Sequence, residues 1–253
     1  LTQFAAQAGL SGLHLLFGDA ADARAAREQG WVAREQPQFH WQRDPNWRGY
    51  EDFLASLRRD KRKKIQQERR RVNDAGIRFE HLRGEQITPE HWQFFQRCYA
   101  RTHLQFNSPQ ALNLDFFLRV GATMPEHILL IVALKDDTPI ASALNFYDDQ
   151  ALYGRSWGTL EYHDGLHFET CYYQAIEFCI ANNIRTFEGG AQGEHKLARG
   201  FLPVTTWSAH WLAHPRFANA VEAFLQRESG GIERYVDKLN ENSPFKRAPD
   251  IRE

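Results

Sequence analysis

The chain has 253 residues, of which 42% are hydrophobic and 25% charged, as in an ordinary globular protein with one large domain or two small ones. The formal net charge of -1 excludes a strong overall attraction to nucleic acid, and no apolar run approaches the ~18–20 residues of a membrane span. The first residues, LTQFAAQAGL, lack a basic segment and an initiator Met, so they predict no signal peptide and resemble the middle of a longer chain. Cys98, Cys171 and Cys179 form no CxxC pair, which favours reduced thiols and a cytoplasmic protein.

Positive charge is concentrated in residues 58–71, RRDKRKKIQQERRR, which carry about +7 because nine Lys and Arg accompany two acids. The surrounding stretch, 50–76, is rich in helix formers and ends at Gly76, which predicts one long, half-exposed helix. Two interpretations stay open: a solvated connector, or a surface for the phosphates of a nucleotide-linked substrate, tRNA or an anionic lipid. The cations of that surface are Arg58, Arg59, Lys61, Arg62, Lys63, Lys64, Arg69, Arg70 and Arg71.

The elements that follow are set by hydrophobic periodicity and by turn residues. Thr88 and Pro89 predict the start of a helix, as cap and first residue. Three alternating runs separated by short polar turns predict an antiparallel meander. In the amphipathic helix after it, the apolar stripe places Tyr172 in the core and Tyr173 at the rim. The expected order is strand 77–82, helices 88–104 and 112–123, strands 127–135, 139–147 and 151–159, helix 167–182, strands 184–188 and 204–212, and helix 216–228.

The chain also repeats itself at an offset of about 170 residues, without gaps. Residues 12–41 align with residues 182–211. The shared glycine-aromatic and His-Trp pairs predict two copies of one fold, of which the first is present only as its last third. The charged triplet Glu194-His195-Lys196 has no counterpart in the first copy, so it is more easily explained by function than by packing. The matched pairs are Phe17 with Phe187, Gly30 with Gly200, His40 with His210 and Trp41 with Trp211.

Three stretches carry a resemblance to a known family: PQFHW with the basic segment, LYGRSWG with GLHFETCYYQ, and FEGGAQGEHKLARGF. They resemble bacterial N-acyltransferases described as peptidoglycan biosynthesis or recognition proteins, which are similar to Fem-type peptidyltransferases. The resemblance implies tandem GNAT-like α+β domains, each a mixed sheet flanked by helices. The expected divisions are a remnant of a first domain (1–45), a basic connecting helix (46–76), a complete second domain (77–231) and a polar tail (232–253).

The resemblance implies transfer of an acyl or aminoacyl group to an amine of a cell-wall precursor or similar anionic substrate. The donor would be acyl-CoA or an aminoacyl-tRNA, and no metal is expected. Where a GNAT enzyme usually holds the pyrophosphate of CoA, this chain reads GTLEYHDGLHF, with Glu161 and Asp164 between glycines. Acidic side chains there would repel a pyrophosphate, so CoA use is in doubt in this half.

Acyl transfer to an amine needs a group that accepts its proton. Glu188 ends a strand where ligands often bind, and it is either that base or an acid paired with a nearby cation. Glu169 and His167 begin the amphipathic helix, and Glu169 is also favoured there by the helix dipole alone. His195 is a further candidate proton carrier, although a lone loop histidine is more often a surface residue.

Candidate substrate contacts lie on the third meander strand and in the loop after Glu188. Strand alternation places Tyr153, Arg155 and Trp157 on one face, with Arg155 either ion-paired or binding an anion. Lys196 and Arg199 share one side of a helical turn and suit a phosphate or carboxylate. The resemblance supports Lys196 as a contact to the phosphate of the substrate. The other substrate-contact candidates are Gln192, Glu194 and Tyr173.

Three functions remain open on the sequence: an N-acyltransferase, a non-catalytic protein of the same fold that recognises a precursor, and a basic-helix module for tRNA or lipid. The oligomeric state is not predicted.

Overall fold

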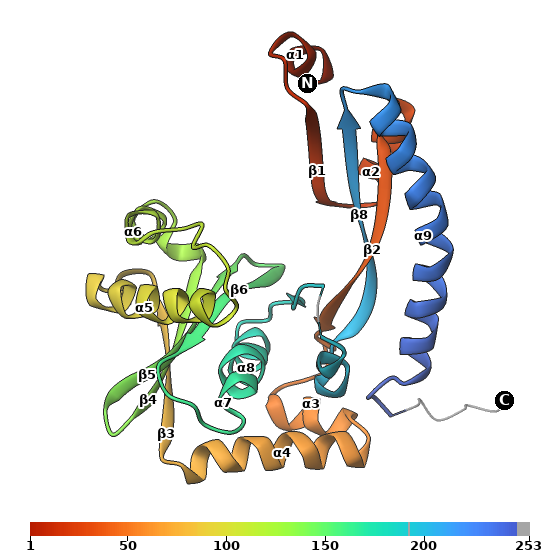
Figure 1. Cartoon of the computed structure of the whole chain (residues 1–253). Coiled ribbons are helices and arrows are strands. Elements are labelled where there is room, and N and C mark those ends of the chain that lie inside the picture. The colour runs from red at the N-terminus through yellow and green to blue at the C-terminus, as the bar shows by residue number, and fades with distance from the viewer. Residues whose placement is uncertain (192, 247–253) are drawn as a thin grey trace, which may run out of the picture. The chain divides into compact units, whose positions relative to one another are not determined.

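A computed structural model describes residues 1–191 and 193–246 and divides the chain into two compact units. The first unit comprises Leu1–His40, Gly190–Leu197 and Phe201–Ser243. The second comprises Trp41–Gly189, Ala198–Gly200 and the described residues from Pro244 on. Each unit is described by itself below, with the elements labelled as in Figure 1.

The second unit contains a five-stranded mixed sheet in the order β7-β6-β5-β4-β3. Its strands pair antiparallel except for β6 and β7, which run parallel, so the predicted meander is confirmed. Strand β4, in the middle of the antiparallel part, is apolar and almost wholly buried, as expected of a strand covered on both faces. The strands are β3 (Ile77–Arg83), β4 (Ile128–Lys135), β5 (Thr138–Tyr147), β6 (Ala151–Thr159) and β7 (Thr186–Glu188).

Helices cover both faces of this sheet (Figure 1). On one face, α5 (Pro89–Gln105) and α6 (Leu114–Thr123) bury an aromatic cluster against β4 and β5 that includes Phe95, Phe117 and Leu144. On the other face, Ala133, Ala141 and Leu166 share a second cluster with the basic helix. Helix α5 begins at Pro89, as predicted. Single 3₁₀ turns at Gly84–Gln86 and Pro125–His127 complete this part.

The predicted helix 167–182 is present but irregular. It consists of α7 (Leu166–Phe168), a π-helical segment (Glu169–Tyr173) and α8 (Gln174–Ala181). The wider π turn shifts the residues after it relative to a regular helix. Tyr173 is fully buried, so its predicted place at the rim is wrong, whereas Tyr172 is buried as predicted.

The basic segment forms two helices, α3 (Tyr50–Ser56) and α4 (Arg59–Asp74), so the prediction of one continuous helix is wrong. Leu57 between them is extended and fully buried, and it forms a β-bridge with Phe245. The backbone N–H of Arg58 donates to the carbonyl of Pro244 instead of to a helical partner. Pairing with the C-terminal segment thus interrupts the helix.

The first unit contains a three-stranded antiparallel arrangement, β1-β8-β2, with helices α1 (Thr2–Gln7), α2 (Ala20–Glu28) and α9 (Pro215–Glu241) and the 3₁₀ segment Glu194–Arg199, which ends in the second unit. The strands are β1 (Gly12–Gly18), β2 (Val32–Gln42) and β8 (Leu202–Leu212). A shift of 170 residues carries the bounds of β2 onto those of β8, as the internal repeat predicts.

Helix α9 continues well past residue 228, so the predicted helix end and irregular tail are wrong up to Glu241. Its buried Leu225 and Leu239 give it an apolar stripe that outweighs the low helix propensity of Gly230 and Gly231. Residues 247–253 of the predicted tail lie outside the described residues.

Candidate functional site

A β-bulge shapes strand β6 of the second unit. Leu144 pairs with Ser156 and the next residue, Asn145, pairs with Gly154, so Arg155 is an extra residue in the ladder. A bulge bends its strand, turns side chains to new directions and leaves a local gap in the pairing. The hydrogen-bonded pairing of β6 with β7 ends nearby, at Tyr153 and Glu188.

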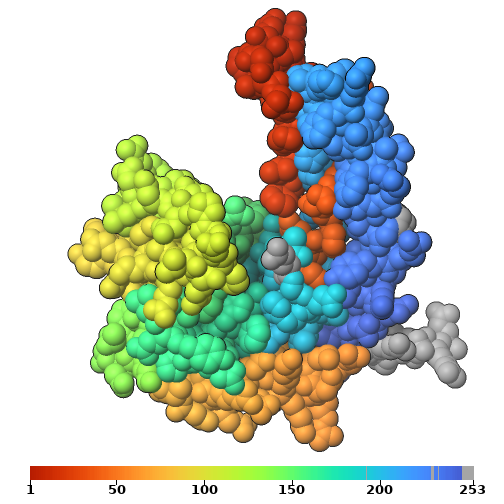
Figure 2. Space-filling view, in the orientation of Figure 1, coloured from red at the N-terminus to blue at the C-terminus, as the bar shows by residue number. Residues whose placement is uncertain are grey.

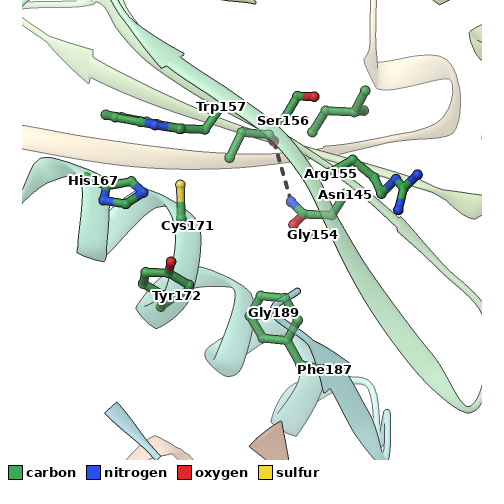
Figure 3. A pocket seen from close by; sticks show the side chains of 12 residues that line it. Asn145, Gly154, Arg155, Ser156, Trp157, His167, Cys171, Tyr172, Phe187 and Gly189 are labelled. Carbon is green, nitrogen blue, oxygen red and sulfur yellow. Dashed lines mark hydrogen bonds between the residues drawn. The ribbon is translucent and has the colours of Figure 1, made fainter. Parts of the chain in front are cut away.

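A cavity of about 140 Å³ lies where β6 and β7 part. The strands contribute the bulge residues, and the helix on this face contributes side chains that point at them (Figure 3). The lining residues are Ala143, Leu144, Asn145, Gly154, Arg155, Ser156, Trp157, His167, Cys171, Tyr172, Phe187 and Gly189. Three residues predicted from the sequence to form the site, Arg155, Trp157 and His167, are thus brought together in one cavity.

Aromatic and imidazole rings form one wall of this cavity. The ring of His167 lies 4.6 Å from that of Trp157 and 5.6 Å from that of Tyr172, measured between centroids. Burial raises the pKa of Tyr172, so its phenol keeps its proton at neutral pH. The wall therefore holds one imidazole and one neutral hydroxyl donor.

Glu188 stands between two lining residues, Phe187 and Gly189, at the end of β7. Its carboxyl is half-buried, and burial raises its pKa above the usual value of a glutamate, with Asp148 adding to the rise. The positive charge of Arg155 acts in the opposite direction. A carboxylate with a raised pKa is a better proton acceptor than an ordinary surface acid.

Tyr153 and Trp157 lie on opposite faces of the sheet, so their predicted common face is wrong. Tyr153 pairs with Phe146, which packs against the α5 side, and with Glu188. Trp157 packs on the other side. The extra residue Arg155 reverses the alternation between them.

Glu169 lies in a buried ion network. It is only 3% exposed, and Arg69 donates to both of its carboxylate oxygens at 3.1 and 3.2 Å. Arg69 also pairs with Glu177 at 2.7 Å, and Gln174 donates to Glu169 at 2.7 Å. Burial raises the pKa of Glu169 and Arg69 opposes the rise. Glu169 therefore does not line the cavity, although the sequence suggested it as a catalytic residue. Arg69 is bonded within the second unit and does not belong to an open cationic surface.

Arg199 lies in a second buried network. The residue is 1% exposed, and its guanidinium donates to Glu68 at 2.7 Å and lies 3.4 Å above the ring of Phe168. The hydroxyl of Tyr173 donates to the same carboxylate. Arg199 and Tyr173 thus have protein partners where we expected substrate contacts. Gly200 after them has φ +91°, and an added Cβ would lie 2.8 Å from the ring of Phe53, which confirms the helix stop.

The loop residues of the first unit have local contacts of their own. Lys196 is 6% exposed and its Nζ lies 3.4 Å from the carbonyl oxygen of Gly190. Glu194 accepts a hydrogen bond from Tyr235 at 2.8 Å, and His195 is exposed. Gln192 lies outside the described residues. The roles predicted for these residues stay predictions.

The outer side of α4 carries the remaining cations and forms an open surface, orange in Figure 2. Lys61 pairs with Asp60 at 3.1 Å and Arg71 with Asp164 at 2.5 Å. The exposed cations on α4 and just before it are Arg58, Arg59, Lys63, Lys64, Arg70 and Arg71, whereas Lys61 and Arg62 are half-buried.

The segment in the place of a CoA loop is explained by packing. Gly158 lies inside β6, where an added Cβ would meet the carbonyl oxygen of Cys98. Gly165 has φ +86° and an added Cβ would lie 3.2 Å from the carbonyl oxygen of Glu68. Within the part of the chain that the structure describes, no group of three or more His, Cys, Asp or Glu could hold a metal ion, and no helix is long and apolar enough to cross a membrane.

Sequence reasoning did not identify Asn145, Ser156, Cys171 or Tyr172 as cavity residues. Asn145 had a signal, because it is a lone amide in the apolar run PIASALNFY, and it is 2% exposed. Cys171 belongs to the apolar stripe of the sequence, and in the structure it lies in the π-helical segment and lines the cavity (Figure 3). Ser156 could not be found without the bulge.

This order of elements, with a bulged strand that parts from a parallel neighbour, defines a GNAT-like α+β fold. A family model described as peptidoglycan biosynthesis/recognition, FemAB-like, matches residues 1–247. The chain belongs to the FemAB-like family.

Solved structures support the same fold at low identity. The chain is similar to FemX (TM-score 0.61, 9% identity), covering 87% of this chain and 77% of FemX. It is also similar to L-PGS from Bacillus licheniformis (TM-score 0.61, 9% identity, 88% and 76% covered). A C-terminal domain from Agrobacterium fabrum, named for lysylphosphatidylglycerol synthetase, matches with TM-score 0.62 and 12% identity over 87% of this chain and 73% of that one. No curated protein sequence matches this chain.

Proposed function

We propose that the chain is an N-acyltransferase of the Fem type, which moves an acyl or aminoacyl group to an amine in the β6–β7 cavity. The observation that carries this proposal is a cavity at the parting of the two strands with a carboxylate of raised pKa, Glu188, at its edge. Membership of the FemAB-like family supports it.

In this proposal Glu188 takes the proton from the acceptor's ammonium, and the neutral amine attacks the carbonyl carbon of the donor. Backbone N–H groups at the bulge around Arg155 face the oxygen on which negative charge develops. The hydroxyl of Tyr172 supplies a proton to the leaving alcohol or thiol as the carbon–oxygen or carbon–sulfur bond breaks. His167, within the same wall, passes the second proton of the attacking amine to the Tyr172 phenolate, which restores the hydroxyl as the amide forms.

An aminoacyl ester, as in aminoacyl-tRNA, is favoured as donor over acyl-CoA. The segment between β6 and α7 offers the carboxylates Glu161 and Asp164 where a pyrophosphate would need donors, and its two glycines are explained by packing. The exposed cations of α4 suit the phosphates of a nucleic acid. The family description supports a cell-wall precursor as the acceptor.

The test is donor consumption by the purified chain. Radiolabelled aminoacyl-tRNA and acyl-CoA pools are incubated with muropeptide precursors, and transfer of label is followed with the wild type, Glu188→Gln and the exposed control Glu161→Gln. We expect amine-dependent transfer from aminoacyl-tRNA that Glu188→Gln abolishes and Glu161→Gln retains. Label that is never transferred, or transfer that survives Glu188→Gln, would contradict the proposal.

A second candidate is a non-catalytic protein of the same fold that recognises a peptidoglycan precursor or another phosphate-bearing ligand. It is favoured by the burial of Glu169 in an ion network, since this acid was a candidate catalyst. In that case precursors bind, Lys196→Ala weakens the binding and no donor is consumed. If the exposed cations of α4 alone account for binding, the affinity falls steeply with salt and depends on Arg59, Lys63 and Lys64.

A further inference from the structure

Two histidines meet across the antiparallel pair β1–β8 in the first unit. His14 and His210 are direct cross-strand partners, so their side chains point to the same face. Their Nδ1 atoms lie 2.8 Å apart and their ring centroids 5.0 Å apart. They are 196 residues apart in the sequence, so no spacing motif could reveal the pair.

The space between these nitrogens holds a single proton. One ring must donate its Nδ1–H and the other must accept it with a lone pair, and two imidazolium rings would repel each other. Burial lowers the pKa of His210, and the charges of His14 and Arg34 lower it further. The neighbouring charges are those of Arg34 on β2 and Glu228 on α9, which pair at 2.8 Å. A contact of this length between two ring nitrogens requires that one of them offers a lone pair.

The second nitrogen of His210 is also fixed. Its Nε2 lies 2.9 Å from the hydroxyl oxygen of Ser208. If both rings carry their proton on Nε2, the one on His210 is donated to Ser208 and both Nδ1 lone pairs converge on one point. Hydrogen bonding of the outer ring nitrogen is the usual way in which a histidine ligand is oriented.

We propose that His14 and His210 form a binding site for a divalent transition-metal ion of the Zn²⁺, Ni²⁺ or Cu²⁺ class. Metal–nitrogen bonds of about 2.0–2.1 Å in tetrahedral geometry set two nitrogens roughly 3.3 Å apart, so the rings need only a small outward rotation. The ion takes the place of the shared proton, which moves from Nδ1 to Nε2 of the donor ring, and no proton is lost from the neutral pair. Water completes the coordination, because the part of the chain that the structure describes holds no group of three metal-binding side chains.

A cavity of about 370 Å³ lies beside His14, lined by Gly12, His214 and Phe217 among others. Imidazole suits Zn²⁺, Ni²⁺ and Cu²⁺, whereas Mg²⁺ and Ca²⁺ prefer oxygen ligands. A bound ion would join β1 to β8, and since the two nitrogens meet only in the folded chain, it would stabilise that pairing.

The test uses the full chain, freed of metal with a chelator and titrated calorimetrically with Zn²⁺, Ni²⁺ and Mg²⁺. We expect one Zn²⁺ or Ni²⁺ per chain, no Mg²⁺, and weaker binding at acid pH as protons compete for the two nitrogens. His14→Ala and His210→Ala should each weaken binding at least about tenfold. The matched control is His103→Ala, a half-buried histidine of the second unit bonded to Ser108.

Thermal unfolding gives an independent measurement. Zn²⁺ should raise the midpoint of the wild type and of His103→Ala and leave that of His14→Ala unchanged. His14 is exposed on an edge strand, so its variant folds even if His210→Ala does not. Failure of the wild type to bind, or equal binding by His14→Ala, would overturn the proposal.

Discussion

Two sides of one helical segment, residues 166–173, have opposite environments. One side carries Glu169 and Tyr173, whose polar atoms are held in buried bonds to Arg69 and Glu68 of α4. The other side carries Cys171 and Tyr172, which line the cavity together with His167 (Figure 3). Residues two positions apart thus serve packing and ligand access respectively, because such residues lie on nearly opposite sides of a helix.

The same contrast separates the two acids that the sequence offered as catalysts. Glu169 has a cation and an amide bonded to it inside the second unit, so its charge is already neutralised. Glu188 is half-buried at the end of a strand, and burial raises its pKa although the charge of Arg155 opposes the rise. A partner in the fold marks a structural acid, and a raised pKa beside a cavity marks a candidate base.

The largest expected effect is on turnover in Glu188→Gln. If Glu188 accepts the amine proton, kcat should fall by about 10²–10⁴-fold, as for loss of a general base. Stability should not fall, because the amide keeps the shape of the side chain. Transfer kinetics and urea unfolding of the same preparation check both parts, and a parallel fall in stability would place Glu188 among the structural acids.

The next effect is on stability in Arg199→Met. The change leaves the buried carboxylate of Glu68 without its cation, which should cost about 3–5 kcal/mol of the free energy of unfolding. Urea unfolding measures it. Arg78→Met, which breaks the exposed pair with Glu80, is the control and should unfold like the wild type. Equal effects of the two changes would show that the Glu68 network is not structural.

A smaller loss of stability is expected in Glu169→Gln. The amide removes a charged hydrogen-bond partner of Arg69 and should cost roughly 1–3 kcal/mol. Turnover per folded molecule should stay near that of the wild type, since Glu169 does not line the cavity. Loss of turnover without loss of stability would restore Glu169 as a catalytic residue.

The sequence predicted elements whose signals are local. Thr88-Pro89 began a helix, the short polar turns divided the meander, and the match between residues 32–42 and 202–212 was visible as a repeat. Hydrophobic periodicity did not predict side-chain directions correctly where a strand or helix departs from its regular geometry. The bulge at Arg155 and the π turn at 169–173 each shift the following side chains, and neither has a local sequence signal.

Ion pairs were the other limit. Glu68 and Arg199 are 131 residues apart, and nothing in either stretch identifies the partner. Arg69 looked like one of nine equivalent cations until packing placed it beside Glu169. The charges of these residues made them candidates for a site in the sequence. Only the tertiary structure separates the residues of structural ion pairs from those that line the cavity.

A moderate effect is expected in the pH profile. Because the pKa of Glu188 is raised, kcat/KM should decline with falling pH at a higher pH than for an ordinary glutamate, with a midpoint above 4.5. Arg155→Met removes the cation that opposes the rise, so this limb should move to still higher pH. The contribution of Glu188 to stability has the opposite trend: it is present below the unfolded pKa and is lost as pH rises through the folded pKa. A limb that does not move in Arg155→Met would exclude Glu188 as the titrating group.

The smallest effect is on the reactivity of one thiol, and it tests the cavity side directly. Cys98 and Cys179 are fully buried, and burial raises the pKa of Cys98 to about 12 and that of Cys179 as well. Cys171 is half-buried and lines the cavity, so iodoacetamide should modify it first, as peptide mass spectrometry would show. The adduct occupies a space of only about 140 Å³, so it should slow transfer, and prior incubation with donor should protect the thiol. Cys171→Ser should remove both the adduct and the inhibition. Equal labelling of the three cysteines in the folded chain would mean that the cavity is not the accessible site, and the division between the two sides of the helix would then fail.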